Sequence, residues 1–187
     1  MLARKYSVDE LMASSWDRKL ANDLAAEIEA GTGEDRHAIG EMRRFLAVKG
    51  YRELMQRIEE AARGKTSYGA LTAVALEMRR YALERPALSA AAFRMEAVDS
   101  PEWRQAHANI HAFMMGIFAD CGLIEEAAED ALLMLRSLVR GFVLNELMHS
   151  VLGVRSYDEC FEKAIRVLIA GLSALHPGPR GSCVIAG

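Results

Sequence analysis

The chain has 187 residues, of which 51% are apolar and 26% are charged, and its net charge is −3. This composition excludes a disordered chain, because the apolar side chains suffice for a core, and it excludes a uniformly basic nucleic-acid-binding protein. No apolar run reaches the roughly 18 residues that a bilayer-spanning helix needs. The three cysteines are widely spaced, so we expect reduced thiols in a cytoplasmic protein that is not attached to a membrane.

The first part of the chain predicts only short, weakly patterned helices. Residues 8–30 contain two short helical stretches, and in the second of them apolar residues such as Leu20 and Leu24 recur every four positions. The Gly31-Thr32-Gly33 sequence predicts a turn, and residues 34–39 could form one further short helix. We therefore expect a small helical head that ends near residue 40.

The rest of the sequence predicts longer helices with strong apolar periodicity. Gly64, Pro86 and Gly122 mark the ends of three of them, because these residues end helices or cannot continue them. No pair of strands is predicted, so the expected fold class is all-α. The helices are expected at 41–63, between 67 and 86, at 87–93, between 100 and 122, at 124–152 and at 157–175, and residues 177–187 are expected to form a tail.

Residues 124–152 form a long segment that is apolar on most faces. Such a helix is expected to be buried on several sides. Its polar residues come in narrow groups, among them Arg136 with Arg140. A buried Arg140 would need an anionic partner, and Glu146 does not lie at a helical spacing that would allow a direct pair with it.

Two stretches in the C-terminal two-thirds of the chain carry motifs. Residues 81–88 read YALERPAL, and residues 138–146 read LVRGFVLNE. They resemble the ALEHPAL and LHGFVxLE segments of the TetR family of bacterial transcription repressors, the second in a subgroup with a Trp-His-Gly motif, whose His is replaced here by Arg140. Residues 157–175 are similar to the closing helix of that subgroup, so the resemblance covers residues 40–175.

This resemblance implies a ligand-responsive regulator that acts as a homodimer. The last two long helices of each chain would form a four-helix interface around a two-fold axis. Residues 41–176 would form the ligand-binding and dimerisation domain, with a small apolar effector in a cavity between helices. The helix at 41–63 would link that cavity to the head. No cofactor is implied.

Residues 1–40 resemble the helix-turn-helix head of the family in part. Residues 24–28 are similar to its first helix, and Gly31-Thr32 fits its turn. Asp35 stands where the family has an apolar Leu, and His37 lies one position out of register with the family's phosphate-contacting His. The implied DNA contacts are Thr32, Arg36 and His37, with Arg43 and Arg44 near the DNA backbone.

The charge of this head keeps a second function class open. Residues 17–40 contain three basic and six acidic side chains, which give a net charge of −3. DNA affinity comes largely from Lys and Arg side chains that neutralise phosphates, so an acidic head works against binding double-stranded DNA. One hypothesis is a regulator that binds DNA. The alternative is a homodimeric ligand-binding or protein-interaction module whose head has lost DNA binding.

Methionine and aromatic residues gather in the predicted helices after residue 41. Methionine adapts to irregular shapes, so together with the family resemblance it predicts an apolar effector pocket, although an ordinary Met-rich core is the alternative. His107 and His111 lie four residues apart on one helix and could hydrogen-bond the polar head of a ligand. The residues expected to line the pocket are Met78, Phe93, His107, His111, Met114, Met115, Phe118, Met134 and Phe142.

The two histidines could also reach one metal ion, because their spacing places them on one helix face. No paired cysteines or Glu-containing zinc motif accompany them, so we predict no metal site. The sequence holds no Ser-His-Asp order of interest and no phosphate-binding glycine loop, and we do not predict an enzyme. A small helical-bundle enzyme would require His107 and His111 to converge with an acid in an open cleft.

Overall fold

The computed structural model describes residues 39–86, 88–89, 100–148 and 156–175. The predictions for residues 1–38, for Phe93 and for the tail lie outside these residues. Thr32, Arg36 and His37 are therefore not placed, and the boundary expected near residue 40 stays a prediction.

Every regular element in the described residues is a helix, which confirms the all-α fold class. The helices expected between 67 and 86 and between 100 and 122 end close to where glycine, proline and capping residues predict. The expected end of the helix at 124–152 and most of the helix at 87–93 lie outside the described residues. The helices are α2 (Ile39–Ala62), α3 (Ser67–Glu84), α5 (Pro101–Asp120), α6 (Glu125–Met148) and α7 (Tyr157–Gly171), and the 3₁₀ helix η2 (Leu172–Leu175) follows α7 directly.

Local sequence accounts for several helix ends. The backbone N–H of Trp103 donates to the hydroxyl of Ser100, 3.2 Å away, which satisfies one of the free donors at the start of α5. The backbone N–H of Glu159 donates in the same way to the Ser156 hydroxyl at the start of α7. After α5 the chain turns at Gly122, whose φ of 86° lies in the left-handed region that glycine adopts without strain.

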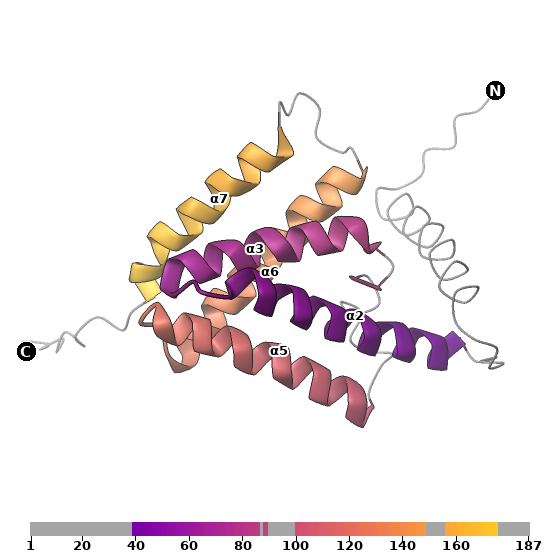
Figure 1. The fold of residues 1–187 in the computed structure, drawn as a ribbon. Coiled ribbons are helices and arrows are strands. Elements are labelled where there is room, and N and C mark those ends of the chain that lie inside the picture. The colour runs from indigo at the N-terminus through magenta and orange to yellow at the C-terminus, as the bar shows by residue number, and fades with distance from the viewer. Residues whose placement is uncertain (1–38, 87, 90–99, 149–155, 176–187) are drawn as a thin grey trace, which may run out of the picture.

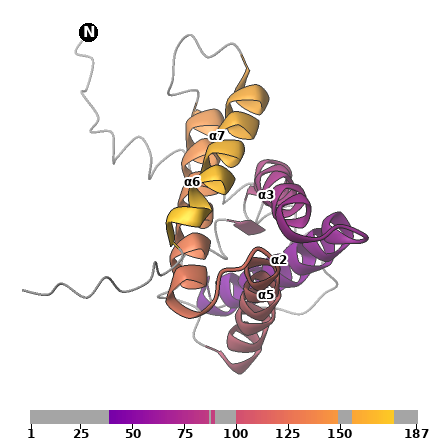
Figure 2. The ribbon, with the colours of Figure 1, turned by 90° about the vertical axis from the view of Figure 1, so that its left-hand side faces the viewer.

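The helices form two groups that lie against each other (Figures 1 and 2). α6 and α7 lie side by side, and Figure 2 shows α2, α3 and α5 next to that pair. α3 is central, because it contacts α2, α5, α6 and α7. Large, almost fully buried side chains fill the core between the helices, among them Tyr81, Met114, Phe118, Leu135 and Phe161.

α6 differs from the expectation of a helix buried on several sides. Its exposed side includes Leu133, of which 66% is accessible, and Met134. Arg140 is exposed too, so it does not need the buried partner that the sequence suggested. The apolar pattern of a single helix does not tell a face covered within the chain from one left open, and here one side of α6 is left open.

Glu146 instead pairs with an arginine from another helix. Arg79 in α3 is buried, and its guanidinium donates to Glu146 of α6 at 2.6 Å and to Asp158 of α7 at 2.7 Å. The guanidinium also lies over the ring of Phe161, 5.2 Å from the centroid. Burial acts to lower the pKa of Arg79, but hydrogen bonds to Asp158 and Glu146 outweigh it and the pKa is raised. Arg79 therefore ties α3 to both helices of the other group as a permanent cation.

Candidate ligand-binding cavity

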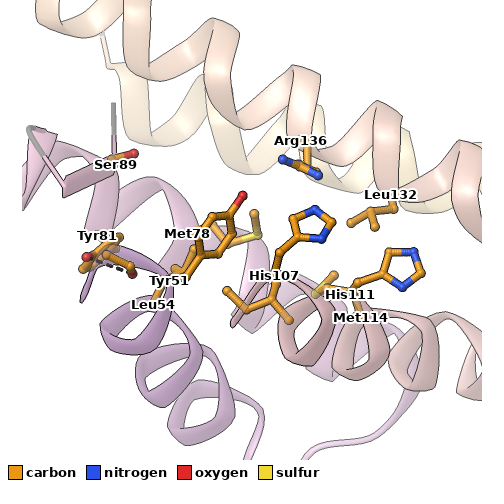
Figure 3. A pocket seen from close by; sticks show the side chains of 12 residues that line it. Tyr51, Leu54, Met78, Tyr81, Ser89, His107, His111, Met114, Leu132 and Arg136 are labelled. Carbon is orange, nitrogen blue, oxygen red and sulfur yellow. Dashed lines mark hydrogen bonds between the residues drawn. The ribbon is translucent and has the colours of Figure 1, made fainter. Parts of the chain in front are cut away.

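A small cavity lies between α2, α3, α5 and α6 (Figure 3). Its volume is about 40 Å³, which exceeds the roughly 10–15 Å³ that one water needs but is far below the roughly 300 Å³ of a drug-sized pocket. It can therefore hold a small chemical group as it stands, and a larger ligand requires side chains to move. The cavity is lined by Gly50, Tyr51, Leu54, Met78, Tyr81, Ser89, His107, Ile110, His111, Met114, Leu132 and Arg136.

One wall of the cavity adjoins a row of stacked rings on α5. Trp103, His107 and His111 are spaced four residues apart and so share one face of the helix. The rings of Trp103 and His107 are stacked with centroids 5.3 Å apart, and those of His107 and His111 are 6.3 Å apart. Tyr51 of α2 meets the His107 ring edge-on at 5.7 Å. The stack holds the plane of the His107 ring against the cavity.

Arg136 of α6 brings a positive charge to this stack. Figure 3 shows its guanidinium above the His107 ring and on the side of the cavity where the Tyr51 hydroxyl lies. Burial raises the pKa of Tyr51, and the charge and hydrogen bond of Arg136 offset only part of that rise. Tyr51 therefore stays protonated at neutral pH.

The two histidines differ in their surroundings. Burial lowers the pKa of His107, and the charges of Arg136 and His111 lower it further, so its ring is neutral at neutral pH. His111 instead lies 2.7 Å from a carboxylate, measured from its Nε2 to Oε1 of Glu129. Glu129 belongs to α6 and does not line the cavity. Ser89 lies at the opposite end of the cavity from His111 in Figure 3, so these groups do not form a nucleophile–base pair.

The far end of the cavity depends on a close contact at Gly50. The Tyr81 hydroxyl donates to the Gly50 carbonyl at 3.1 Å, and burial keeps that hydroxyl protonated by raising the pKa of Tyr81. A Cβ added to Gly50 would lie 2.7 Å from the carbonyl oxygen of Leu88. The sequence suggested a bend or close packing at this glycine, and close packing is what the structure has. It brings Ser89 against the cavity.

Four of the residues predicted to bind the ligand line this cavity, namely Met78, His107, His111 and Met114. The structure places the other described ones elsewhere. Phe118 is fully buried in the core, Met115 is partly buried and packs against that core, and Met134 is on the exposed side of α6. Phe142 packs against Phe161 with ring centroids 5.1 Å apart. Ligand binding by any of these residues stays a prediction.

Sequence reasoning missed Tyr51 and Arg136, which supply the most polar part of the cavity. One signal for Arg136 was present, because it interrupts the apolar pattern of residues 124–152. No signal for Tyr51 was present, since it falls on the regular apolar stripe of its helix. Arg43 and Arg44, the two expected DNA contacts within the described residues, belong to α2 ahead of the cavity-lining part of that helix.

A second depression is larger but carries paired charges. It is an open groove of about 460 Å³ between α2 and α3. Arg57 there lies 2.6 Å from Glu84 and 3.4 Å from Glu77, and Arg80 also pairs with Glu77. The charged side chains that line this groove therefore already form ion pairs, so they offer no unpaired charge to a ligand. No group of three side chains in the described ranges could hold a metal ion.

Comparison with known families places the cavity in context. Residues 71–168, just over half of the chain, match the family described as "Tetracyclin repressor-like, C-terminal domain". The chain belongs to the TetR family. The match begins in α3 and ends in α7, so it includes the TetR-like helices that supply Met78, the histidines and Arg136, whereas Tyr51 precedes it. No curated protein matches the chain. Among the described helices, none has the length and apolar character needed to cross a membrane.

Proposed function

We propose that this protein is a homodimeric, ligand-responsive transcriptional regulator whose effector binds at the cavity between α2, α3, α5 and α6. The observation that carries this proposal is the cavity itself, which has apolar walls and a polar end at Arg136, Tyr51 and His107 in a TetR-family effector domain. Residues 41–176 would be the effector domain and residues 1–40 the DNA-binding head, with Thr32, Arg36, His37, Arg43 and Arg44 as its contacts.

α2 is the element that would carry the response to the head. It has 24 residues and is therefore about 36 Å long. Its middle supplies Gly50, Tyr51 and Leu54 to the cavity, and its first turn follows directly on the head. A ligand that displaces Tyr51 would shift this helix. Such a ligand changes DNA affinity only if it binds one arrangement of the two heads better than the other.

The exposed sides of α6 and α7 support dimerisation through these helices. The exposed Leu133 and Ser137 and the half-buried Leu144 recur at helical spacing along α6. The exposed Val167 and Gly171 do so along α7, where 72% of Val167 is accessible. We name this group the α6/α7 face. A Cβ added to Gly171 or Gly141 would meet nothing within 4 Å in the chain. These glycines are not needed for packing within one chain, and small residues allow two helices to approach closely.

A DNA-retention screen tests the regulator. Fragments of the source genome are mixed with the protein at low salt and the retained fragments are identified by mobility shift. The double variant R43A/R44A should weaken binding and reduce its salt dependence, because two phosphate contacts are lost. R52A, on an exposed site further along α2, is the matched control and should change little. A folded dimer that retains no fragment would overturn DNA binding.

The alternative is a ligand-binding or protein-interaction module without DNA binding. The net charge of −3 over residues 17–40 is the observation that favours it. Both candidates share the cavity and the α6/α7 face, so ligand binding and dimerisation do not separate them. Retention of DNA that a cavity ligand releases would exclude the module, whereas ligand binding without DNA retention would favour it.

A further inference from the structure

We infer that the cavity takes an apolar monocarboxylate, whose carboxylate pairs with the Arg136 guanidinium and accepts a hydrogen bond from the Tyr51 hydroxyl, while its apolar body enters between Met78 and Met114. This inference rests on the proposed function, since it names the ligand class of the same cavity. It is tested by ligand binding alone, so that it can fail or stand independently of DNA binding.

Arg136 brings a positive charge into the cavity that no carboxylate of the described residues balances. It is half-buried, and among the described residues no carboxylate forms an ion pair with it. Two other arginines packed between helices are fully paired: Arg79 binds Glu146 and Asp158, and Arg57 binds Glu77 and Glu84. A cation half removed from water gains most from an anion that supplies the missing partner. In this cavity a ligand can be that anion.

The side chains that line the cavity carry a positive charge and no negative one. None of the twelve lining residues is acidic. Two carboxylates outside the lining contact lining side chains: Glu129 lies 2.7 Å from His111, and Glu53 lies 3.4 Å from the Tyr81 hydroxyl, at the far end of the cavity from Arg136. A cationic ligand would therefore meet the guanidinium of Arg136 without any compensating carboxylate. A neutral ligand would leave that guanidinium as it is. An anion is the one class of ligand whose binding the cavity charge favours.

A carboxylate fits the polar end of the cavity better than a phosphate does. The polar end offers one guanidinium and one hydroxyl, with the neutral ring of His107 beside them. A guanidinium fork matches the two oxygens of a carboxylate, and a single charge balances a single charge. A phosphate dianion has more oxygens and charge than these groups can satisfy. The cavity volume of about 40 Å³ also suits a small head group.

The apolar body of the ligand contacts the apolar side chains of the lining. The remaining lining side chains include Leu54, Ile110 and Leu132 together with Met78 and Met114. Methionine is unbranched and changes rotamer readily, so these two side chains can yield space that the unliganded cavity lacks. We expect affinity to rise with the apolar area of the ligand until the methionines can move no further.

The experiment compares head groups on one apolar body. Calorimetric titrations into the full-length protein use two series of ligands that differ only in the head group. The first series is octanoate, octan-1-ol and octylamine, and the second is 3-phenylpropionate and 3-phenylpropan-1-ol. Trp103 gives a second signal, because it is stacked on His107 and its fluorescence should change when a ligand reaches that ring. The carboxylates should bind at least about 10-fold more tightly than the alcohols, as expected for a charge-assisted hydrogen bond, and the amine should bind most weakly.

Substitutions locate the carboxylate. R136Q should lower carboxylate affinity by about 10- to 100-fold and leave alcohol affinity unchanged. R140Q is the matched control, because Arg140 is exposed one turn further along α6, and it should bind as the unmodified protein does. Y51F should weaken carboxylate binding by a smaller factor, and it keeps the inference testable if R136Q does not fold. Circular dichroism checks the fold of each variant.

Three results would overturn the inference. One is an alcohol or amine that binds as tightly as its carboxylate, and another is a folded R136Q that keeps carboxylate affinity. The third is a complete lack of carboxylate binding by the folded protein. A carboxylate whose binding depends on Arg136 but which releases no DNA would support this inference. The same result would count against the proposal that the protein is a ligand-responsive transcriptional regulator. A neutral ligand that binds the cavity and releases DNA would support the regulator and count against the carboxylate inference.

Discussion

The guanidinium of Arg79 in α3 lies 2.6 Å from the carboxylate of Glu146 in α6, and Arg79 is almost completely buried. The neighbouring residue, Met78, lines the cavity on the same helix. Through Glu146 and Asp158, Arg79 therefore joins the cavity wall to the two helices that carry the α6/α7 face. If the family's dimer forms as proposed, displacement of α3 by a ligand reaches the dimer interface through this ion pair rather than through apolar packing alone.

The two carboxylates that bind Arg79 should contribute unequally to stability. E146Q should lower the free energy of unfolding by about 1–3 kcal/mol, because it removes a charge-assisted hydrogen bond to a buried cation. D158N should cost less than about 1 kcal/mol, since 81% of the Asp158 side chain is accessible and water screens its charge. Urea denaturation of both variants measures the difference. A larger loss for D158N would contradict the assignment of Glu146 as the main partner.

Gly50 should be intolerant of a methyl group. G50A places a Cβ 2.7 Å from a backbone oxygen of Leu88, and backbone cannot yield as a flexible side chain does. Overpacking of this kind costs about 1–3 kcal/mol, which exceeds the roughly 1 kcal/mol that alanine gains in a helix. G116A in α5 is the matched control, because nothing lies within 4 Å of its Cβ, and it should raise the thermal midpoint. Equal shifts in the two variants would refute the close contact.

The sequence was sufficient for the helices but not for the cavity. Helix ends are local: Ser100 caps α5, and Gly122 ends it, through atoms only a few residues away. The meeting of Tyr51 and Arg136 is not local, because periodicity gives the buried face of each helix and not the helix that it faces. Met114 and Phe118 show the limit most plainly. Both lie on the apolar stripe of α5, yet only Met114 reaches the cavity.

The same limit applies to charges. The sequence places Arg140 and Glu146 on one predicted helix and indicates no partner for either, whereas in the structure Glu146 binds Arg79, which lies 67 residues away in the chain. The outward face of α6 carries the same kind of apolar residues as its inward face, so the pattern predicts burial on several sides. Leu133 is nevertheless exposed within one chain. Pattern alone cannot separate residues buried within a chain from residues that a second chain would cover.

His107 should make the protein less stable in mild acid. Its pKa is lowered by burial first and then by the charges of Arg136 and His111, below the ordinary value of about 6.5. As the pH falls, the unfolded chain binds this proton before the folded one does. The stabilisation is therefore complete above about pH 6.5 and is lost as the pH drops through the unfolded pKa toward the folded one.

The variant H107F isolates this effect, because phenylalanine can keep the contacts with Trp103 and Tyr51 and does not titrate. The thermal midpoint of the unmodified protein should fall more between neutral and mildly acidic pH than that of H107F. The His107 resonances should also titrate below the ordinary range of histidine in an NMR series. An identical pH profile for both proteins would show that His107 is not held neutral by its surroundings.

The α6/α7 face should hold two chains together. L133D should shift the protein from dimer to monomer, because a carboxylate in the middle of an apolar interface loses its water without gaining a partner. V167D should act in the same way, since it lies on the exposed side of the adjacent helix. Tyr68, an exposed apolar residue at the start of α3, provides the control Y68D, which should stay dimeric. Light scattering coupled to size-exclusion chromatography measures the mass of each protein. If L133D and V167D remain dimers while folded, the interface lies elsewhere, and if the unmodified protein is a monomer, the dimer proposal is wrong.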